Sequence, residues 1–383
     1  MSAATIAFHC GLPRPGQTAG VAGCWGPPSL GEGIGGSEEA AIHLARELAA
    51  RGHAVTVFNP CGPLAGEYDG VVYRPEAELD GAVRYDVLVS WRRVLFVERE
   101  VRAGCKVWWL HDSPKVPEWF RRMPWGARYF ERSAREVFGS ADRVAVLSQF
   151  HRGLLADFAA DGRVFVTRNG VHLPDFDVGP VRREPRRVIY PVCYARGLEH
   201  LLRMWPAVRA EVPDAELHAF YGWHSVLDPE VGRRLRELVA QPGVFEHGQV
   251  GHRRLAEEYL RAGIFAYPSH TPEVFSISTL KAQLAGCVPI VTATGALPEV
   301  ARAGVVVPGS GGEPATDGAF QAALIELLRD VESQERLRAD VLRLPREAHS
   351  WARVAEEWER ELVAPALAGG STGAPRGAVM GTP

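Results

Sequence analysis

The stretch GEGIGGSEEAAIHLARELAARGHAVTVF, residues 31–58, combines a glycine-rich turn, an amphipathic helix and a buried strand. Its alanines and leucines recur at intervals of three and four residues and form one apolar helical face. Ser37 is placed to cap this helix, and Gly52 is placed to end it. The apolar run AVTVF (54–58) then predicts a buried strand. A glycine turn, helix and strand in this order favour an α/β fold.

The glycines Gly31, Gly33 and Gly36 spell the G-x-G-x-x-G pattern of dinucleotide-binding turns, but two parts of that fingerprint are missing. The glycines should follow a strand directly, whereas the preceding strand, TIAFHC (5–10), lies about twenty residues upstream. Asn59 stands where an acidic residue would bind the ribose. What remains is a helix N-terminus that suits an anion. We interpret the turn as phosphate-binding, with a flexible glycine-rich loop as the alternative.

Short apolar strands alternate with amphipathic helices along the chain, which predicts parallel sheets covered by helices on both faces. The segment 170–187 is rich in proline, glycine and charge, and the pattern restarts after it. We therefore expect two doubly wound α/β domains. The predicted strands are TIAFHC (5–10), AVTVF (54–58), DVLVS (86–90), KVWWL (106–110), RVAVL (143–147), RVFVT (163–167), RRVIYPV (186–192), AELHAFY (215–221), GIFAYP (263–268), VPIVTA (288–293) and GVVVP (304–308).

The expected domain boundaries follow from this restart. Residues 1–175 form the first domain and residues 176–345 the second. The amphipathic segment 346–365 carries tryptophans and is expected to pack back on the first domain as a helix. Residues 366–383 have no core-forming pattern and are predicted to be disordered.

The composition argues against several classes of function. The 383 residues carry a net charge of −3, so no overall field favours nucleic acid. The six cysteines are scattered without a C-x-x-C pair, which indicates reduced thiols rather than a metal cluster. There is no signal peptide and no apolar run of about 20 residues, so we expect a cytoplasmic protein without a transmembrane segment.

Three polar side chains follow predicted strands, each in a different loop. His111 follows KVWWL, Arg196 follows RVIYPV and Glu273 follows GIFAYP. Because ligands of open α/β sheets bind at the carboxyl ends of the strands, these are the candidate site residues. Beyond Glu273, a second anion-accepting helix start is formed by Val274, Phe275, Ser276 and Ile277.

These segments resemble retaining glycosyltransferases of the GT-B type, in particular glycosyltransferase family 4. The resemblance covers roughly residues 5–305, in the family's order. It implies two Rossmann-like domains facing across a cleft, and transfer of a sugar from a nucleoside diphosphate to a small-molecule acceptor. It implies no cofactor and no metal ion. The matching segments are GIGGSEEAAIHLARELAARGHAVTVF, WWLHD, VLSQFHR, VTRNGVHL, YARGLEHLL and PEVFSISTLKAQLAGCVPIVTATGALPE.

The resemblance also implies roles for single residues. Gly35 and Gly36 would let the backbone approach the donor diphosphate. His111 would contact the donor sugar, Arg196 would neutralise the departing diphosphate, and Glu273 would bind sugar hydroxyls. The backbone N–H groups that follow Glu273 would hold sugar and phosphate.

Two positions depart from the family pattern. The Gly-Arg pair expected ahead of Arg196 is replaced by PVCY (191–194). Lys281 stands where the family has a second glutamate that binds the ribose. A lysine only donates hydrogen bonds, so we assign Lys281 to a ribose oxygen or to the diphosphate, which makes a dTDP-sugar a candidate beside UDP- and GDP-sugars. A lysine packed against apolar neighbours is the alternative.

Other interpretations stay open. His111 could be structural, Arg196 could form a surface ion pair, and Glu273 could serve the helix dipole. Asp175-Phe176-Asp177 spells a D-x-D metal motif, but it lies in the linker and reads as a solvated loop. Two segments are also open: 13–33 as a lid over the acceptor, and 119–138 as a surface helix or a weak peripheral contact to an anionic membrane.

Two rival functions also remain. One is a Rossmann oxidoreductase that uses the G-x-G-x-x-G turn, although the displaced glycines and Asn59 disfavour it. The other is a non-catalytic protein that binds a nucleotide sugar, motivated by the missing Gly-Arg pair and by Lys281. The donor base, the donor sugar, the acceptor and the oligomeric state are not encoded in any pattern of the sequence.

Overall fold

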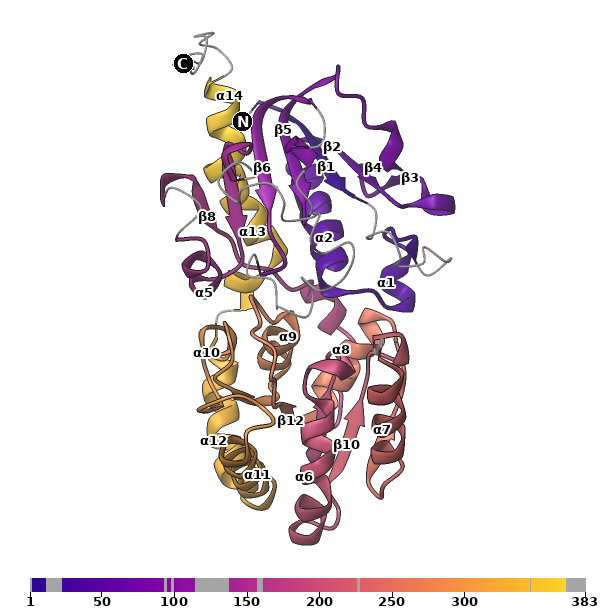
Figure 1. The fold of residues 1–383 in the computed structure, drawn as a ribbon, viewed down its shortest axis with the longest axis vertical. Helices are drawn as coiled ribbons and strands as arrows, with labels where there is room; N and C mark the ends of the chain where they lie inside the picture. The colour runs from indigo at the N-terminus through magenta and orange to yellow at the C-terminus, as the bar shows by residue number, and fades with distance from the viewer. Residues whose placement is uncertain are drawn as a thin grey trace, which may run out of the picture.

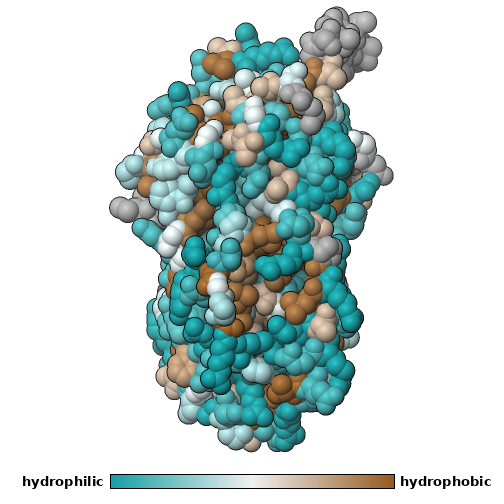
Figure 2. Space-filling model, turned by 180° about the vertical axis from the view of Figure 1, so that it is seen from behind, coloured by the Kyte–Doolittle hydropathy of each residue, from teal (hydrophilic) through white to brown (hydrophobic). Residues whose placement is uncertain are grey.

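The computed structural model describes residues 2–11, 23–92, 95–97, 100–113, 138–156, 161–225, 228–344 and 346–369. They form two α/β domains stacked along the long axis of the molecule (Figure 1). Seen from behind, apolar surface gathers around the middle of the molecule, near the level at which the domains meet (Figure 2). No described helix combines the length and the apolar character needed to cross a bilayer.

Two segments singled out in the sequence lie partly or largely outside the described residues. Of the loop at 13–33, considered as a lid, residues 13–22 lie outside them. Of the segment 119–138, considered as a surface helix or a membrane contact, only residue 138 is described.

Within the described residues, the first sheet has eight strands in the order β3-β4-β2-β1-β5-β6-β7-β8. Strand β3 runs antiparallel to β4, and the other neighbours are parallel. The central strand β1 pairs with β2 and β5 in the order expected of a doubly wound sheet. The strands are β1 (Thr5–Cys10), β2 (Ala54–Asn59), β3 (Gly66–Tyr68), β4 (Val71–Pro75), β5 (Arg84–Trp91), β6 (Arg102–Trp109), β7 (Arg143–Val146) and β8 (Val164–Val166).

The second sheet has six described strands, all parallel, in the order β11-β10-β9-β12-β13-β14. The strands are β9 (Glu184–Tyr190), β10 (Glu216–Ala219), β11 (Val244–Glu246), β12 (Ala262–Tyr267), β13 (Val288–Thr292) and β14 (Val305–Val307). The helices of this domain are α6 (Leu198–Glu211), α7 (Pro229–Val239), α8 (His252–Arg261), α9 (Ile277–Ala285), α10 (Leu297–Val300), α11 (Pro314–Arg329) and α12 (Val331–Leu342).

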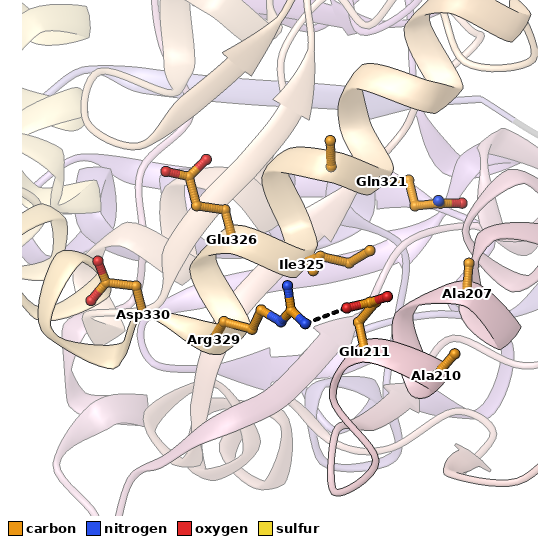
Figure 3. A pocket seen from close by; sticks show the side chains of 9 residues that line it. Ala207, Ala210, Glu211, Gln321, Ile325, Glu326, Arg329 and Asp330 are labelled. Carbon is orange, nitrogen blue, oxygen red and sulfur yellow. Dashed lines mark hydrogen bonds and ion pairs between the residues drawn. The ribbon is translucent and has the colours of Figure 1, made fainter.

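An open groove of about 610 Å³ lies between α6 and α11 on the second domain. Arg329 of α11 forms an ion pair with Glu211 of α6 across it (Figure 3). The residues of α6 that line the groove, Ala207, Ala210 and Glu211, lie in the last turns of the helix, at the opposite end from its start at Leu198. The groove is therefore separate from the carboxyl ends of the strands.

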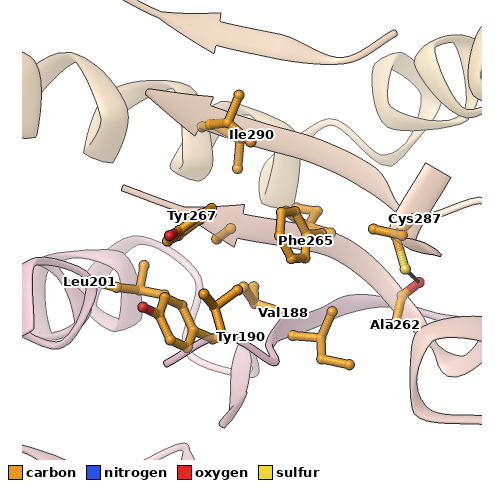
Figure 4. Packing of buried hydrophobic residues seen from close by; sticks show 14 of the residues in the cluster. Val188, Tyr190, Leu201, Ala262, Phe265, Tyr267, Cys287 and Ile290 are labelled. Carbon is orange, nitrogen blue, oxygen red and sulfur yellow. Dashed lines mark hydrogen bonds between the residues drawn. The ribbon is translucent and has the colours of Figure 1, made fainter. Parts of the chain in front are cut away.

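The core of the second domain is a closely packed layer of aromatic and branched side chains. Tyr190, Phe265 and Tyr267 are fully buried together with Val188 and Ile290 (Figure 4). This core fixes β9 and β12 side by side, so the loops that leave their carboxyl ends are neighbours.

Helix α2, which follows the glycine-rich turn, has a different N-cap from the one that the sequence predicts. It spans Gly36–Ala50, and Gly35 is its N-cap with no side-chain cap bond, so the prediction that Ser37 caps the helix is wrong. The chain leaves the helix as predicted, because Gly52 takes the left-handed conformation with φ 93°. The shorter helices of this domain are α1 (Ser29–Glu32) and α5 (Gln149–Gly153).

The chain returns to the first domain at its end. Helix α13 (Trp351–Trp358) buries Trp351 and Trp358 in the core of the first domain. Trp358 Nε1 donates to Thr167 Oγ1 at 2.8 Å. Helix α14 (Ala364–Gly369) then covers the first residues of the tail predicted to be disordered, a difference from the expectation.

Candidate functional site

The carboxyl ends of both sheets meet at the boundary between the domains. Ser148 follows β7, and its hydroxyl donates to the carbonyl oxygen of Val274, which follows β12, at 2.7 Å. Gly36 opens α2, and a Cβ built on it would lie 3.3 Å from Cδ1 of Ile277, which opens α9. The structure therefore brings together the two helix N-termini that the sequence singles out as anion-binding.

The start of α9 is shaped by its own side chains. Ser276 is the N-cap, and its hydroxyl accepts from the backbone N–H of Thr279 at 3.2 Å. The N–H groups of the first helical turn point out of the helix end because they have no intrahelical acceptor. The helix ends at Ala285, and its C-cap Gly286 is left-handed with φ 80°. Phe275 packs against the cores of both domains.

Arg196 and Glu273 form a pair beside this helix start. Arg196 Nη1 donates to both carboxylate oxygens of Glu273, at 2.9 and 3.1 Å. Tyr267, the last residue of β12, donates its hydroxyl to the same carboxylate. The Glu273 carboxylate raises the pKa of Arg196 above its ordinary value, so the guanidinium keeps its charge. Its side chain is 46% exposed, which leaves it accessible to an anion.

His111 follows β6 and lies in an aromatic setting. Its ring centroid is 4.4 Å from that of Trp109 and 5.8 Å from that of Trp91. Burial and the neighbouring Arg92 guanidinium lower the pKa of His111 to about 3, so the ring is neutral. Its Nε2 atom has no hydrogen-bond partner among the described residues. No hydrogen bond or ion pair within the described chain joins His111 to Arg196 or Glu273.

A charged group next to His111 was not predicted. Arg92 follows β5, and its Nε and Nη2 atoms donate to the carboxylate of Asp112 at 2.8 and 3.1 Å. The guanidinium also lies 3.6 Å from Glu38 of α2. Arg92 has φ 59°, an unusual conformation for a residue other than glycine, and such strain gathers at functional sites. Both Arg92 and Asp112 follow strands, so the rule that selected His111 could have found them.

The geometry revises the expected role of Lys281. Its Nζ atom lies 2.7 and 2.9 Å from the two carboxylate oxygens of Glu39 in α2, and both side chains are buried. Burial alone would raise the pKa of Glu39, yet the Lys281 ammonium and the His252 ring outweigh it and hold the pKa well below its ordinary value. Lys281 thus contacts the first domain. This geometry does not favour the contact to the ribose or diphosphate of a donor that the sequence led us to expect.

Among the described residues, the buried side chains of Glu39, His43 and His252 lie close enough together to bind a metal ion. Two features make this group unsuitable. Arg46 donates to Nδ1 of His43 at 2.9 Å, so the neutral ring carries its proton on Nε2, the atom that faces Glu39. The Lys281 ammonium already neutralises the carboxylate. We therefore describe these residues as a charge network.

The D-x-D motif of the linker differs from the solvated loop that the sequence predicts. Asp175 and Phe176 lie in a short 3-10 turn (Leu173–Phe176), Asp175 lies 2.9 Å from His172 Nδ1, and Phe176 is buried in the core of the second domain. His43, His172 and Asp175 also form a second, partly buried group of possible metal ligands.

Comparison with known proteins gives a family match for part of the chain and a match in fold for almost all of it. Residues 187–330, most of the second domain, match the family of glycosyl transferases group 1. No curated protein sequence matches the chain.

Solved structures match almost the whole chain at low sequence identity. Sucrose-phosphate synthase from Thermosynechococcus elongatus is 18% identical with a TM-score of 0.67, covering 94% of this chain and 100% of that one. HepE of Anabaena in complex with UDP and glucose is 14% identical with a TM-score of 0.67 and the same two coverages. WaaG, a glycosyltransferase involved in lipopolysaccharide biosynthesis, is 14% identical with a TM-score of 0.67, covering 92% of this chain and 98% of its own. The chain therefore has the two-domain GT-B fold, and residues 187–330 of its second domain are similar to group 1 glycosyl transferases.

Proposed function

We propose that this protein is a retaining, family 4-like glycosyltransferase that moves a sugar from a nucleoside diphosphate to a small-molecule acceptor without a metal ion. The observation that carries the proposal is the Arg196–Glu273 pair at the start of α9, opposite the glycine-opened start of α2. Together, the pair and the two helix starts place a cation, a carboxylate and two helix N-termini close to one another. That combination suits a sugar diphosphate.

In the proposed reaction, the bond between the sugar C1 atom and the diphosphate breaks while a bond from the acceptor oxygen to C1 forms on the same face. The acceptor proton passes to the departing diphosphate. Arg196 and the N–H groups at the starts of α2 and α9 stabilise the negative charge that develops on the leaving group. No side chain acts as a nucleophile.

The remaining residues would position the sugar. The Glu273 carboxylate accepts hydrogen bonds from sugar hydroxyls when they displace one of its present partners, Tyr267 or Arg196. The neutral His111 ring stands on the first-domain side, and its Nε2, which has no partner in the described part of the chain, would contact the sugar. HepE, which shares the fold, has been solved with UDP and glucose, which supports a nucleotide-sugar donor here.

A second candidate is a non-catalytic protein that binds a nucleotide sugar. Two observations favour it. PVCY (191–194) lacks the Gly-Arg pair of the family, and Lys281 contacts Glu39 instead of the donor region. The rival oxidoreductase has less support, because Asn59 at the end of β2 donates to the carbonyl oxygen of Trp25, at 2.7 Å, and holds a loop.

Proton NMR of the full-length protein with UDP-, GDP-, ADP- and dTDP-glucose separates these functions. We expect slow release of one nucleoside diphosphate with the sugar in its original anomeric configuration, unchanged by excess EDTA. Binding without any release would support the non-catalytic protein. An inverted anomer would contradict retention, and loss of turnover in EDTA, restored by a divalent ion, would contradict metal independence.

A further inference from the structure

A buried ion pair joins the two domains behind the paired helix N-termini. Lys281 belongs to α9 and Glu39 to α2, and they lie 242 positions apart in the sequence. Their side chains are 9% and 3% exposed. Separating the domains would expose both charges, and removing one residue would leave the other buried and uncompensated, which is strongly unfavourable.

The pair continues a contact that begins at the helix ends. Gly36 meets Ile277 in the first turns, and Glu39 meets Lys281 about one turn further along both helices. These two contacts set the distance between the first turns of α2 and α9. The starts of the two helices are therefore held next to each other.

A third element supports the turn from the outside. His252 opens α8, with Nδ1 3.4 Å from Glu39 Oε1 and Nε2 3.3 Å from the carbonyl oxygen of Ile34. One ring thus contacts residues on both sides of Gly35 and Gly36. The side chain of Gln249 also donates to the carbonyl oxygen of Gly33. The glycine turn of the first domain is held by side chains of the second.

We infer that Lys281 is a positioning residue: through Glu39, and together with His252, it clamps the Gly35–Gly36 turn against the start of α9, so that both helix N-termini bind one nucleoside diphosphate. This inference rests on the proposed function for the identity of the ligand. It gives the lysine that replaces the second family glutamate a role in preorganising the site, without contact to the donor. Groups held in place before binding lose less entropy on binding.

The clamp is tested first without a ligand, by hydrogen exchange with mass spectrometry on the full-length protein. The variants are Lys281→Met, Glu39→Gln and the double variant. The double variant removes both charges of the pair, so it buries no unpaired charge and should fold. The matched control is Arg51→Met with Glu359→Gln, which removes an ion pair at the opposite end of α2. We expect exchange in residues 33–39 and 274–281 to rise about tenfold in the double variant and to stay unchanged in the control. Parental protection in the double variant would overturn the clamp.

The second measurement is the affinity for UDP, GDP, ADP and dTDP by titration calorimetry. For the nucleotide that the parent binds, we expect each single variant and the double variant to lose affinity by a similar factor, about tenfold, because all three break the same contact. Loss in Lys281→Met with parental affinity in Glu39→Gln would instead show that Lys281 contacts the nucleotide, and would overturn the inference. If the parent binds none of the four, the proposed function fails, and hydrogen exchange alone decides the clamp.

Discussion

The carboxylate of Glu273 receives hydrogen bonds from two neighbouring strands. Tyr267 ends its own strand, β12, and Arg196 lies in the loop after the adjacent strand, β9. Both Arg196 and Glu273 could be predicted from the sequence because each follows an apolar strand. Their pairing could not, because 77 residues separate them and only the sheet order makes them neighbours.

His111 provides a prediction at the residue scale. Its ring is neutral and lies on the first-domain side of the site, so it should serve the sugar more than the nucleotide. In His111→Ala we expect kcat to fall by about tenfold or more, with nucleotide affinity within about twofold of the parent. Steady-state kinetics and nucleotide titration measure the two effects. A folded variant with full turnover would remove His111 from the site.

Gly295 supports Glu273 through the backbone. It has φ 66°, and a Cβ on it would collide with the backbone N and O atoms of Glu273. We expect Gly295→Ala to destabilise the protein by about 2–4 kcal/mol and to lower activity, because strain and a clash add. Gly52→Ala is the matched control, since Gly52 has φ 93° but open space at the Cβ position. Equal losses of stability in urea unfolding would show that the clash is absent.

At the scale of elements, the apolar runs predicted as strands do form strands, whereas strands β3, β4 and β11 were not predicted. Strands β3 and β4 surround Asp69 and Gly70, which have φ 50° and 77°. An Asp-Gly pair of this kind is a strong signal of a hairpin turn, so this element could have been predicted. Strand β11 has three residues, and only its pairing with β10 distinguishes it from a loop. The Lys281–Glu39 contact lies beyond any local pattern, because it depends on how the domains pack.

Helix α13 gives a prediction at the same scale. Trp358 is 1% exposed in the first-domain core and donates to Thr167. Trp358→Ala should lower the free energy of unfolding by about 3–5 kcal/mol, because a large cavity remains and Thr167 Oγ1 loses the hydrogen bond that it accepts from the indole. Leu342→Ala, at a side chain that is 48% exposed, should change it by no more than about 0.5 kcal/mol. Equal urea midpoints for the two variants would contradict the packing of α13.

At the scale of the whole molecule, buried histidines predict sensitivity to acid. Burial lowers the pKa values of four of them from 6.5, to about 3 or 4, so the folded protein binds fewer protons than the unfolded chain below neutral pH. Stability should therefore fall as the pH drops below about 6.5, by more than about 1.4 kcal/mol per pH unit. Urea unfolding at several pH values measures this slope, and a flat profile would contradict the neutral burial of these rings. They are His111, His151, His218 and His349.

The central claim is that Arg196 and the facing helix N-termini bind a nucleoside diphosphate, and titration calorimetry with UDP, GDP, ADP and dTDP tests it most directly. We expect the parent to bind at least one of them and Arg196→Ala to lose about 1.5–3 kcal/mol of that affinity, because a charge-assisted bond to phosphate is removed. Arg203→Ala, which breaks only an exposed ion pair with Glu199 on α6, should bind like the parent. If Arg196→Ala also retains the parental affinity, the site does not hold the diphosphate as proposed.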